Sequence, residues 1–405
     1  MLLNYKFENF LSFKDRVDFS MLTPGTKVKN RYPDNYVHFD NGYEVLKTAV
    51  IVGENAGGKS NFVKSLEYFK SFFRDNERVS AYKSVINSFA CQTVQSFEIE
   101  VLMDNGYIYL YHLEIDYIGI VSESLSYKSE KAKKYKILLK AVRNSDKINS
   151  DGCKTGMELG YQLQLPVFDR SIVETLKNSA VKENQIGLFI TKLAILGDEH
   201  AICFIEWVKT ILYPETNVIN YDLYQAIRYE QDDLRILKDS RYFDVFRMVD
   251  YSIVAIEVDD GKPYTKTRII RKKENGETFV RELGEDSSGV REFFAWAVQI
   301  FRVVYENKVV FADEMDRVLN PILSDRIISF INGKRHQGQF VFTTHNVLHL
   351  DLKTNMKEQI YFITKNNETL NSELYSLADF SDIRYETTKI YDFYLKGILG
   401  GTTVE

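Results

Sequence analysis

Alternating apolar and polar residues mark the first part of the chain as short strands. Segments 6–10 and 17–21 alternate as half-buried strands do, and 10–14 connects them. Segment 47–53 is instead a β-branched apolar run ending at glycine, which is typical of a strand buried on both faces. A helix should begin at Lys59, because apolar residues then recur at helical spacing, namely Phe62, Val63, Leu66, Phe69 and Phe73.

The middle of the chain changes from strands to helical patterns. Segments 97–101 and 107–111 alternate again, with Asn105-Gly106 as the hairpin turn between them. From residue 128 to 250 the apolar spacing becomes helical, as in 186–196 and 201–212, and polar loops interrupt it. We therefore expect an inserted helical lobe.

Strands return after residue 250 and then alternate with helices. Segment 253–258 reads as a strand, and 267–271 pairs with 278–281 across a turn that contains Gly276. The later runs 309–314 and 339–345 are apolar and end in polar residues, as strands of a buried sheet do. This succession predicts an α/β fold built on a mixed β-sheet.

Composition narrows the class of protein. The chain has 405 residues, 44% hydrophobic and 27% charged, which is the composition of an ordered globular protein. A net charge of −5 argues against a surface built as a whole to coat nucleic acid, although local basic patches stay open. Cys91, Cys153 and Cys203 are too far apart for a CxxC pair, and no segment has the ~20 apolar residues of a membrane span. We expect a cytoplasmic protein that does not enter a membrane.

The most specific motif lies between the buried strand and the following helix. Residues 53–60 match GxxxxGK[ST] in full. Backbone N–H groups of such a loop surround nucleotide phosphates, and the N-terminus of the next helix adds to their positive field. Lys59 would neutralise the phosphates and the Ser60 hydroxyl would ligate Mg²⁺. The predicted ATP-contacting residues are Gly53, Glu54, Asn55, Ala56, Gly57, Gly58, Lys59, Ser60 and Asn61.

Two further strand ends supply the remaining chemistry. Segment 309–314 ends in two acids, the form of a Walker B motif, in which Asp313 would hold Mg²⁺ and Glu314 would deprotonate the attacking water. Segment 339–345 places His345 at the end of another core strand, where parallel sheets bind ligands. Lys59, Glu314 and His345 are the predicted catalytic residues, and Ser60 and Asp313 the predicted metal ligands.

The order of these motifs, with Ser287-Ser288-Gly289 between them, resembles the ABC-type ATPases of the SMC, RecF and OLD class. It is most similar to the AAA-family ATP-binding proteins of bacterial phage-defence and abortive-infection loci. Segments 9–13, 188–194 and 394–401 extend the resemblance over nearly the whole chain. It implies a P-loop NTPase of the ABC-ATPase head type. Motif placement divides this head into residues 1–127 and 251–405, with the helical lobe 128–250 between them.

The resemblance also implies a contact between two copies. Ser287 and Gly289 correspond to a signature that contacts the γ-phosphate held by a second subunit, so the heads should pair as a homodimer or higher oligomer. Asp286 and Val290 depart from the Glu and Thr of the family pattern.

Other family positions are matched less completely. Asp316 corresponds to the D-loop acid, which faces the nucleotide, and His345 to the switch histidine that senses the γ-phosphate. No Q-loop residue is assigned, because Gln92 and Gln95 are both candidates.

Two functions stay open at this point. The first is an ATP-driven dimerisation switch that controls a separate effector, such as a nuclease or TOPRIM protein, in anti-phage defence; the chain ends soon after Gly401, which on this hypothesis leaves that step to the partner. The second is a RecF- or SMC-like DNA-binding ATPase of repair or maintenance. Its support is two basic clusters, within 128–140 and 262–273, while the absence of long heptad arms weighs against chromosome tethering. A GTPase is disfavoured, because the chain lacks an [NT]KxD motif.

Overall fold

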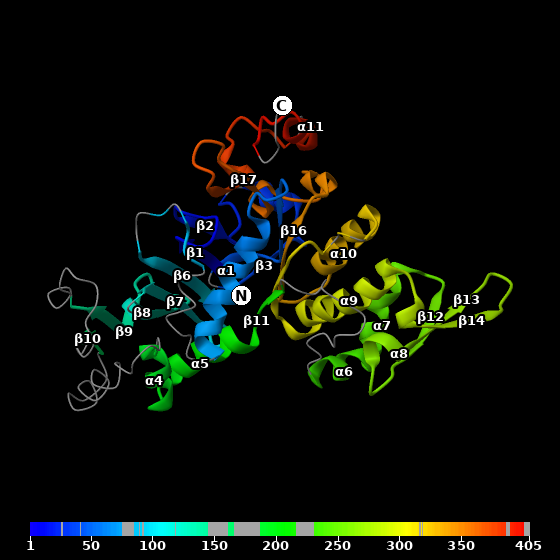
Figure 1. The fold of residues 1–405 in the computed structure, drawn as a ribbon, viewed down its shortest axis with the longest axis horizontal. Coiled ribbons are helices and arrows are strands. Elements are labelled where there is room, and N and C mark those ends of the chain that lie inside the picture. The colour runs from blue at the N-terminus through cyan, green and yellow to red at the C-terminus, as the bar shows by residue number, and fades with distance from the viewer. Residues whose placement is uncertain are drawn as a thin grey trace.

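The computed structural model describes residues 1–400 except 26, 41, 75–84, 89, 91–92, 118, 145–160, 166–186, 216–230, 316, 318 and 386–388. Two sheets form the centre of the molecule (Figure 1). The six-stranded sheet has the order β11-β15-β16-β5-β17-β18. All its neighbouring strands are parallel except β17 and β18. Its strands are β5 (Thr48–Gly53), β11 (Leu212–Glu215), β15 (Val309–Ala312), β16 (Gln339–Thr344), β17 (Ile360–Lys365) and β18 (Ser372–Ser376).

The second sheet is antiparallel and has the order β10-β9-β8-β7-β6-β1-β2. The predicted hairpin turn between β6 and β7 is confirmed, and Gly106 adopts φ +74°, which glycine tolerates best. The strands are β1 (Leu2–Glu8), β2 (Val17–Ser20), β6 (Gln95–Leu102), β7 (Tyr107–Asp116), β8 (Gly119–Ser129), β9 (Lys136–Arg143) and β10 (Tyr161–Gln164).

Helix α1 (Lys59–Arg74) begins at the predicted residue and packs between the two sheets. Its buried face carries the predicted apolar residues, all at most 3% exposed. The Phe62 ring reaches both sides, with centroids 5.4 Å from Phe19 on β2 and 6.1 Å from Phe311 on β15. One aromatic core therefore fixes α1, and with it the loop that precedes α1.

Helices cover the opposite face of the six-stranded sheet. Ala49 and Ile51 of β5 belong to the core around α1, whereas Val50 and Val52 belong to a second core built around α9. Burial on both faces is why the sequence of β5 is a continuous apolar run. The helices on this side are α6 (Gln231–Leu237), α7 (Ser240–Phe246), α9 (Ser288–Glu306) and α10 (Pro321–Gly333).

Smaller elements complete the described chain. A three-stranded sheet of β12 (Ile253–Glu257), β13 (Arg268–Lys272) and β14 (Thr278–Glu282) projects at one end of the molecule, beside α8 (Pro263–Lys266) (Figure 1). The remaining strands and helices are β3 (Tyr36–His38), β4 (Glu44–Leu46), α4 (Phe189–Ile195), α5 (Glu199–Thr210) and α11 (Ile390–Leu395). The predicted turn between β13 and β14 is confirmed, with Gly276 at φ +90°.

The interval 128–250, which the sequence predicts as a helical lobe, contains strands as well as helices. Strands β9 and β10 extend the antiparallel sheet, and β11 is the edge strand beside β15. Strand β11 has four residues, directly follows α5 and contains Pro214, which an edge strand tolerates; its pattern is too short to separate from the helix before it. The division of the chain into three parts stays a prediction.

Residues from the two ends of the sequence meet as predicted. Strand β5 lies between β16 and β17, which begin about 290 and 310 residues further along the chain. The backbone N–H of Leu2 also donates to Oε1 of the buried Gln339, over 2.6 Å. The sites that the sequence places far apart are therefore held on one sheet.

Candidate functional site

The GxxxxGK[ST] loop joins β5 to α1 and depends on its glycines. A Cβ on Gly53 would lie 2.2 Å from the carbonyl oxygen of Ile363 on β17. Gly58 has φ +116°, and a Cβ there would lie 2.4 Å from Oγ of Ser372. Ala56, a non-glycine residue, is also left-handed at φ +61°. Larger residues at the two glycines would displace the loop from β17 and β18.

Lys59 lies inside the curve of this loop. Its Nζ donates to the carbonyl oxygens of Gly53 at 2.9 Å and Glu54 at 2.8 Å, and the residue is 5% exposed. Burial lowers the pKa of the ammonium, and the nearby carboxylates of Glu314, Asp313 and Glu54 oppose that shift. The loop therefore holds a positive charge beside two acids from another strand.

Asp313 directly follows β15 and contacts the start of α1. Its carboxylate accepts hydrogen bonds from the hydroxyls of Ser60 and Thr343, the latter over 2.7 Å to Oδ1. Burial raises the pKa of Asp313, and these two bonds and Lys59 act against that rise. The structure thus brings together Ser60 and Asp313. A hydroxyl and a buried carboxylate are hard oxygen donors of the kind that Mg²⁺ prefers, so these residues fit that ion.

Glu314 extends the site away from the sheet. Its φ of +48° is unusual for a residue with a side chain, and its backbone N–H donates to Oγ1 of Thr343 over 2.8 Å. Oε1 of Glu314 lies 3.6 Å from Nε2 of His345, and the two side chains are 34% and 45% exposed. The acid and the histidine therefore face each other at an accessible edge; the catalytic roles predicted for them stay predictions.

A group of side chains from distant segments braces the loop. The Ser372 hydroxyl donates to the carbonyl oxygen of Gly57 over 2.6 Å and lies 2.8 Å from Oγ of Ser12. Asn61 Nδ2 also donates to Oγ of Ser12 over 2.8 Å. The sequence reasoning missed Ser372 and the role of Thr343. The only signal for Ser12 is its place in the 9–13 segment, and Ser372 carries none.

The signature segment lies elsewhere. Ser287 is the N-cap of α9, where its hydroxyl accepts from the N–H of Val290, and it is exposed. Asp286 is tied to Nη1 of Arg271 over 2.7 Å. Among the described residues, no hydrogen bond or ion pair joins Ser287 or Gly289 to the GxxxxGK[ST] loop of the same chain.

Three predictions fall on or near undescribed residues. Asp316 and Gln92 lie outside the described part of the chain. Gln95 is fully buried at the start of β6, and its Nε2 donates to the carbonyl oxygen of Asn9 over 2.7 Å. Of the cysteines, Cys203 is a free, partly buried thiol, and Cys91 and Cys153 are not described.

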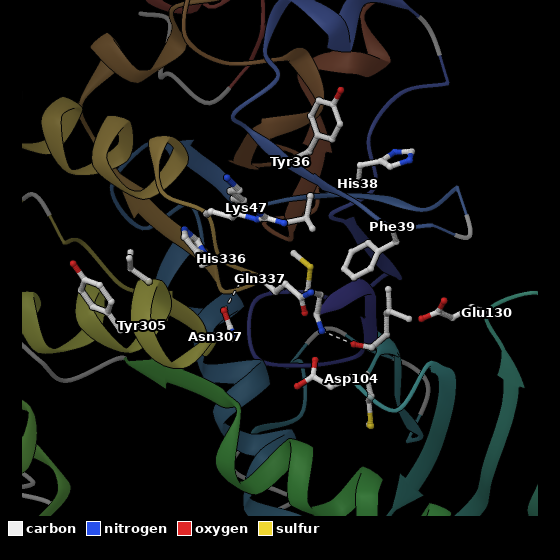
Figure 2. Close-up of a pocket in the computed structure, with 16 residues that line it drawn as sticks. Tyr36, His38, Phe39, Lys47, Asp104, Glu130, Tyr305, Asn307, His336 and Gln337 are labelled. Carbon is white, nitrogen blue, oxygen red and sulfur yellow. Dashed lines mark hydrogen bonds between the residues drawn. The ribbon is translucent and has the colours of Figure 1, made fainter. Parts of the chain in front are cut away.

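A separate cavity of about 880 Å³ lies at the opposite edge of the same sheet (Figure 2). Lys47, Asn307 and Gln337 line it, and they precede β5, β15 and β16 respectively. The cavity is therefore at the amino ends of the parallel strands, whereas Gly53 is the last residue of β5, and Asp313 and His345 directly follow β15 and β16. Ligands of parallel sheets bind at the carboxyl ends, so this cavity is not the predicted nucleotide site.

The two basic clusters differ in their surroundings. In the cluster around β13, Lys266, Arg268, Arg271 and Lys273 pair with carboxylates at 2.6 to 2.9 Å. In the turn between β8 and β9 and on β9, five exposed lysines have no ion pair to another described residue: Lys131, Lys133, Lys134, Lys136 and Lys140. Most cationic side chains of the 262–273 cluster are therefore paired with carboxylates, whereas these five lysines of the 128–140 cluster are not.

Comparisons with known proteins agree with this architecture. Residues 216–351 match the family model described as "AAA domain, putative AbiEii toxin, Type IV TA system". A search of curated proteins finds no match.

Among solved structures, the SMC head bound to the C-winged helix domain of ScpA is similar, with a TM-score of 0.50 and 11% identity over 93% of this chain and 97% of that one. The SMC head domain from Thermotoga maritima gives a TM-score of 0.41 and 11% identity, over 93% of this chain and 98% of that one.

Within the described residues, no helix has the length and apolar character needed to cross a bilayer. The α/β architecture with its mixed sheets, the strand-loop-helix at β5 and the similarity to the SMC head over 93% of the chain establish the fold. The chain has the fold of the P-loop ATPase heads of SMC proteins.

Proposed function

We propose that this chain is an ABC- and SMC-type ATPase that binds ATP with Mg²⁺ and hydrolyses it between two paired copies. The observation that supports this most is the convergence of Lys59, Asp313 and Glu314 at the carboxyl edge of one sheet, although 254 residues separate Lys59 from Asp313. Electrostatic stabilisation and positioning are what phosphoryl transfer requires of a protein, and these three side chains supply them. A cytoplasmic location is part of this proposal.

The side chains of the site have different roles in the proposed reaction. Glu314 accepts a proton from the attacking water as the new O–P bond forms and the bond between the γ-phosphorus and the bridging oxygen breaks, which leaves ADP and phosphate. Lys59 neutralises the phosphate oxygens, and His345, 3.6 Å from Glu314, orients that carboxylate. Mg²⁺ bound by Ser60 and Asp313 would supply positive charge for the β- and γ-oxygens.

Pairing of heads follows from the place of the signature. Ser287 and Gly289 lie at the N-terminus of a 19-residue helix, an end that favours anions, and not at the loop of their own chain. A second copy, arranged head to tail, would present this end to the γ-phosphate of the first. The nucleotide would then join the two copies, and hydrolysis would separate them.

The mass of a hydrolysis-deficient variant tests this pairing. Glu314→Gln should bind ATP, retain it and accumulate as a dimer in native mass measurements, whereas ADP should leave it monomeric. Lys59→Met is the matched control, because it should fail to dimerise at the same ATP concentration. Monomeric Glu314→Gln with ATP bound would contradict the dimerisation switch.

Control of a separate effector in anti-phage defence is the finer part of the proposal. Its support is the family match over residues 216–351 and the motif resemblance. One similar solved structure is an SMC head bound to a domain of ScpA, so a head of this fold can bind a partner protein. Phage plating on cells that carry the native locus tests the role: Lys59→Met should abolish any protection, and equal protection would contradict it.

DNA binding is the second candidate, and the free lysines at and after the β8–β9 turn favour it. Changing Lys131, Lys133 and Lys134 to Glu should abolish salt-dependent binding to a DNA duplex. The same reversal at Lys266, Arg268 and Lys273 should change binding little, because carboxylates already pair those residues. Binding that is absent or insensitive to salt would contradict this candidate.

A further inference from the structure

Thr343 connects the two acids of the site through one hydroxyl group. It is the fifth residue of β16, next to β15 in the sheet, and it is fully buried. Its Oγ1 donates to Oδ1 of Asp313 over 2.7 Å and accepts the backbone N–H of Glu314 over 2.8 Å. The hydrogen and a lone pair of this oxygen are therefore both directed at consecutive residues of the site.

Both bonds add a restraint on residues that carry the site. Asp313 follows the last residue of β15, and its carboxylate accepts hydrogen bonds from Thr343 on one side and Ser60 on the other. Glu314 has φ +48°, a region that residues with a Cβ rarely adopt. Its neighbour Met315 is fully buried, so the chain must turn sharply at Glu314 between two anchored residues. The bond to Thr343 holds the N–H side of that turn.

We propose that Thr343 is a positioning residue that sets the orientation of Asp313 and the backbone of Glu314 together. Through the first bond it directs the carboxylate that faces Ser60, and through the second it fixes the direction in which the Glu314 side chain leaves the sheet. This inference rests on the proposed ATP hydrolysis and names a residue that acts through the two acids. Hydrogen-bond partners of metal-ligating carboxylates commonly control both metal affinity and activity.

A purely structural role is the competing explanation. Buried hydroxyls need partners, and on this explanation Thr343 only satisfies polar groups at the end of a strand, in the way Thr48 does at the opposite edge. Thr48 is 1% exposed, donates to Oδ1 of Asn332 over 3.1 Å and accepts from Nε2 of Gln359 over 2.9 Å. It has the same bonding pattern on the neighbouring strand, far from the acids, and is therefore a matched control.

The experiment compares Thr343→Val, Thr343→Ser and Thr48→Val with the wild-type chain. Valine keeps the shape of threonine and loses both hydrogen bonds, whereas serine keeps the hydroxyl. Steady-state hydrolysis gives kcat and KM for ATP and the Mg²⁺ concentration for half-maximal rate. A second readout without turnover is the affinity for Mn²⁺ in the presence of a non-hydrolysable ATP analogue.

For Thr343→Val we expect kcat to fall about 10- to 100-fold and the affinity for Mn²⁺ to fall about tenfold. The KM for ATP should stay within about threefold, because Lys59 and the loop are untouched. Thr343→Ser should recover most of the rate, and Thr48→Val should lower thermal stability with wild-type kcat and Mn²⁺ affinity.

Two outcomes overturn the inference, and one distinct outcome overturns the proposed function. If the wild-type chain hydrolyses ATP and Thr343→Val matches Thr48→Val in kcat and Mn²⁺ affinity, Thr343 is structural only. If Thr343→Ser recovers neither quantity, the hydroxyl is not the group responsible. If the wild-type chain itself neither hydrolyses ATP nor binds Mn²⁺ with the analogue, the proposed function fails and this inference fails with it.

Discussion

Lys47 and Lys59 lie at opposite ends of β5 and differ in what surrounds them. Both are buried, at 7% and 5% exposure. Lys47 donates to the carbonyl oxygens of Asn332 and Lys334, both at 2.9 Å, where α10 ends. Lys59 donates to two carbonyls of its own glycine-containing loop and has the acids of β15 beside it. Burial and hydrogen bonding of a lysine therefore do not indicate function by themselves. What distinguishes Lys59 is the adjacent loop 53–60 and the nearby carboxylates of Asp313 and Glu314.

Other polar residues at the two edges of the sheet also differ in burial and in their partners. At the amino edge, Gln339 binds Leu2 and Leu46, and Thr48 binds Asn332, so each polar group satisfies a structural partner. At the carboxyl edge, Glu314 and His345 are partly exposed and face each other. We infer that the buried polar groups at the first edge hold segments of the chain together, whereas the partly exposed pair at the second edge is accessible, as the proposed function requires.

The largest expected difference between the two edges is in the effect of replacing each lysine by methionine. Lys59→Met should weaken ATP binding about 100-fold or more, equivalent to ~2.7 kcal/mol, because a charge on the phosphates is lost. Lys47→Met should leave ATP affinity unchanged and lower the free energy of unfolding by about 1–3 kcal/mol, since two carbonyls lose their donor. Calorimetric ATP titration and urea unfolding measure both. Equal effects of the two substitutions on ATP affinity would contradict the assignment of Lys59 to the nucleotide site and of Lys47 to a structural role.

Glycine substitutions test the same difference between the two edges of the sheet. Gly53→Ala would place a Cβ 2.2 Å from the carbonyl oxygen of Ile363, which belongs to the backbone and cannot rotate away. We expect a loss of about 3 kcal/mol in unfolding free energy from this overpacking. Gly333→Ala is the control near the amino edge, where nothing lies within 4 Å of the added Cβ; in helix α10 it should stabilise by about 0.5–1 kcal/mol. A neutral Gly53→Ala would show that β5 and β17 are less tightly joined.

A pH dependence should distinguish a structural buried acid from the acids of the site. Glu123 on β8 is fully buried and accepts from the N–H groups of Phe189 and Ile190 and from the Tyr111 hydroxyl. Burial nevertheless raises the pKa of Glu123 from 4.5 to about 7. Between these values the folded chain keeps a proton that the unfolded chain has lost.

Stability should therefore fall as pH rises from 5 to 7, by about 2 kcal/mol from this group. Glu123→Gln should remove that part of the slope, because glutamine does not titrate. Urea unfolding at pH 5, 6 and 7 measures the slope in both proteins. Parallel slopes would mean that Glu123 is ionised throughout this range.

The strands and loop that carry the site could be predicted because their patterns are local. The run before Gly53, the helix from Lys59 and the strands that end before Asp313 and His345 all lie where the sequence places them. The hydroxyls of Thr343 and Ser372 could not be predicted, since their partners come from other strands or from segments hundreds of residues away. Strand β11 was missed for a related reason: its four residues become a strand through pairing with β15.

The most direct test of the central claim is phosphate release from ATP by the wild-type chain and by Glu314→Gln, at saturating Mg²⁺ and ATP. We expect measurable turnover by the wild-type chain and a turnover rate lower by about 100-fold or more in Glu314→Gln. The affinity for ATP should be retained, because the variant keeps Lys59 and loses only the base. Equal turnover by the two proteins would contradict the assignment of Glu314. The absence of both binding and turnover in the wild-type chain would contradict the ATPase itself.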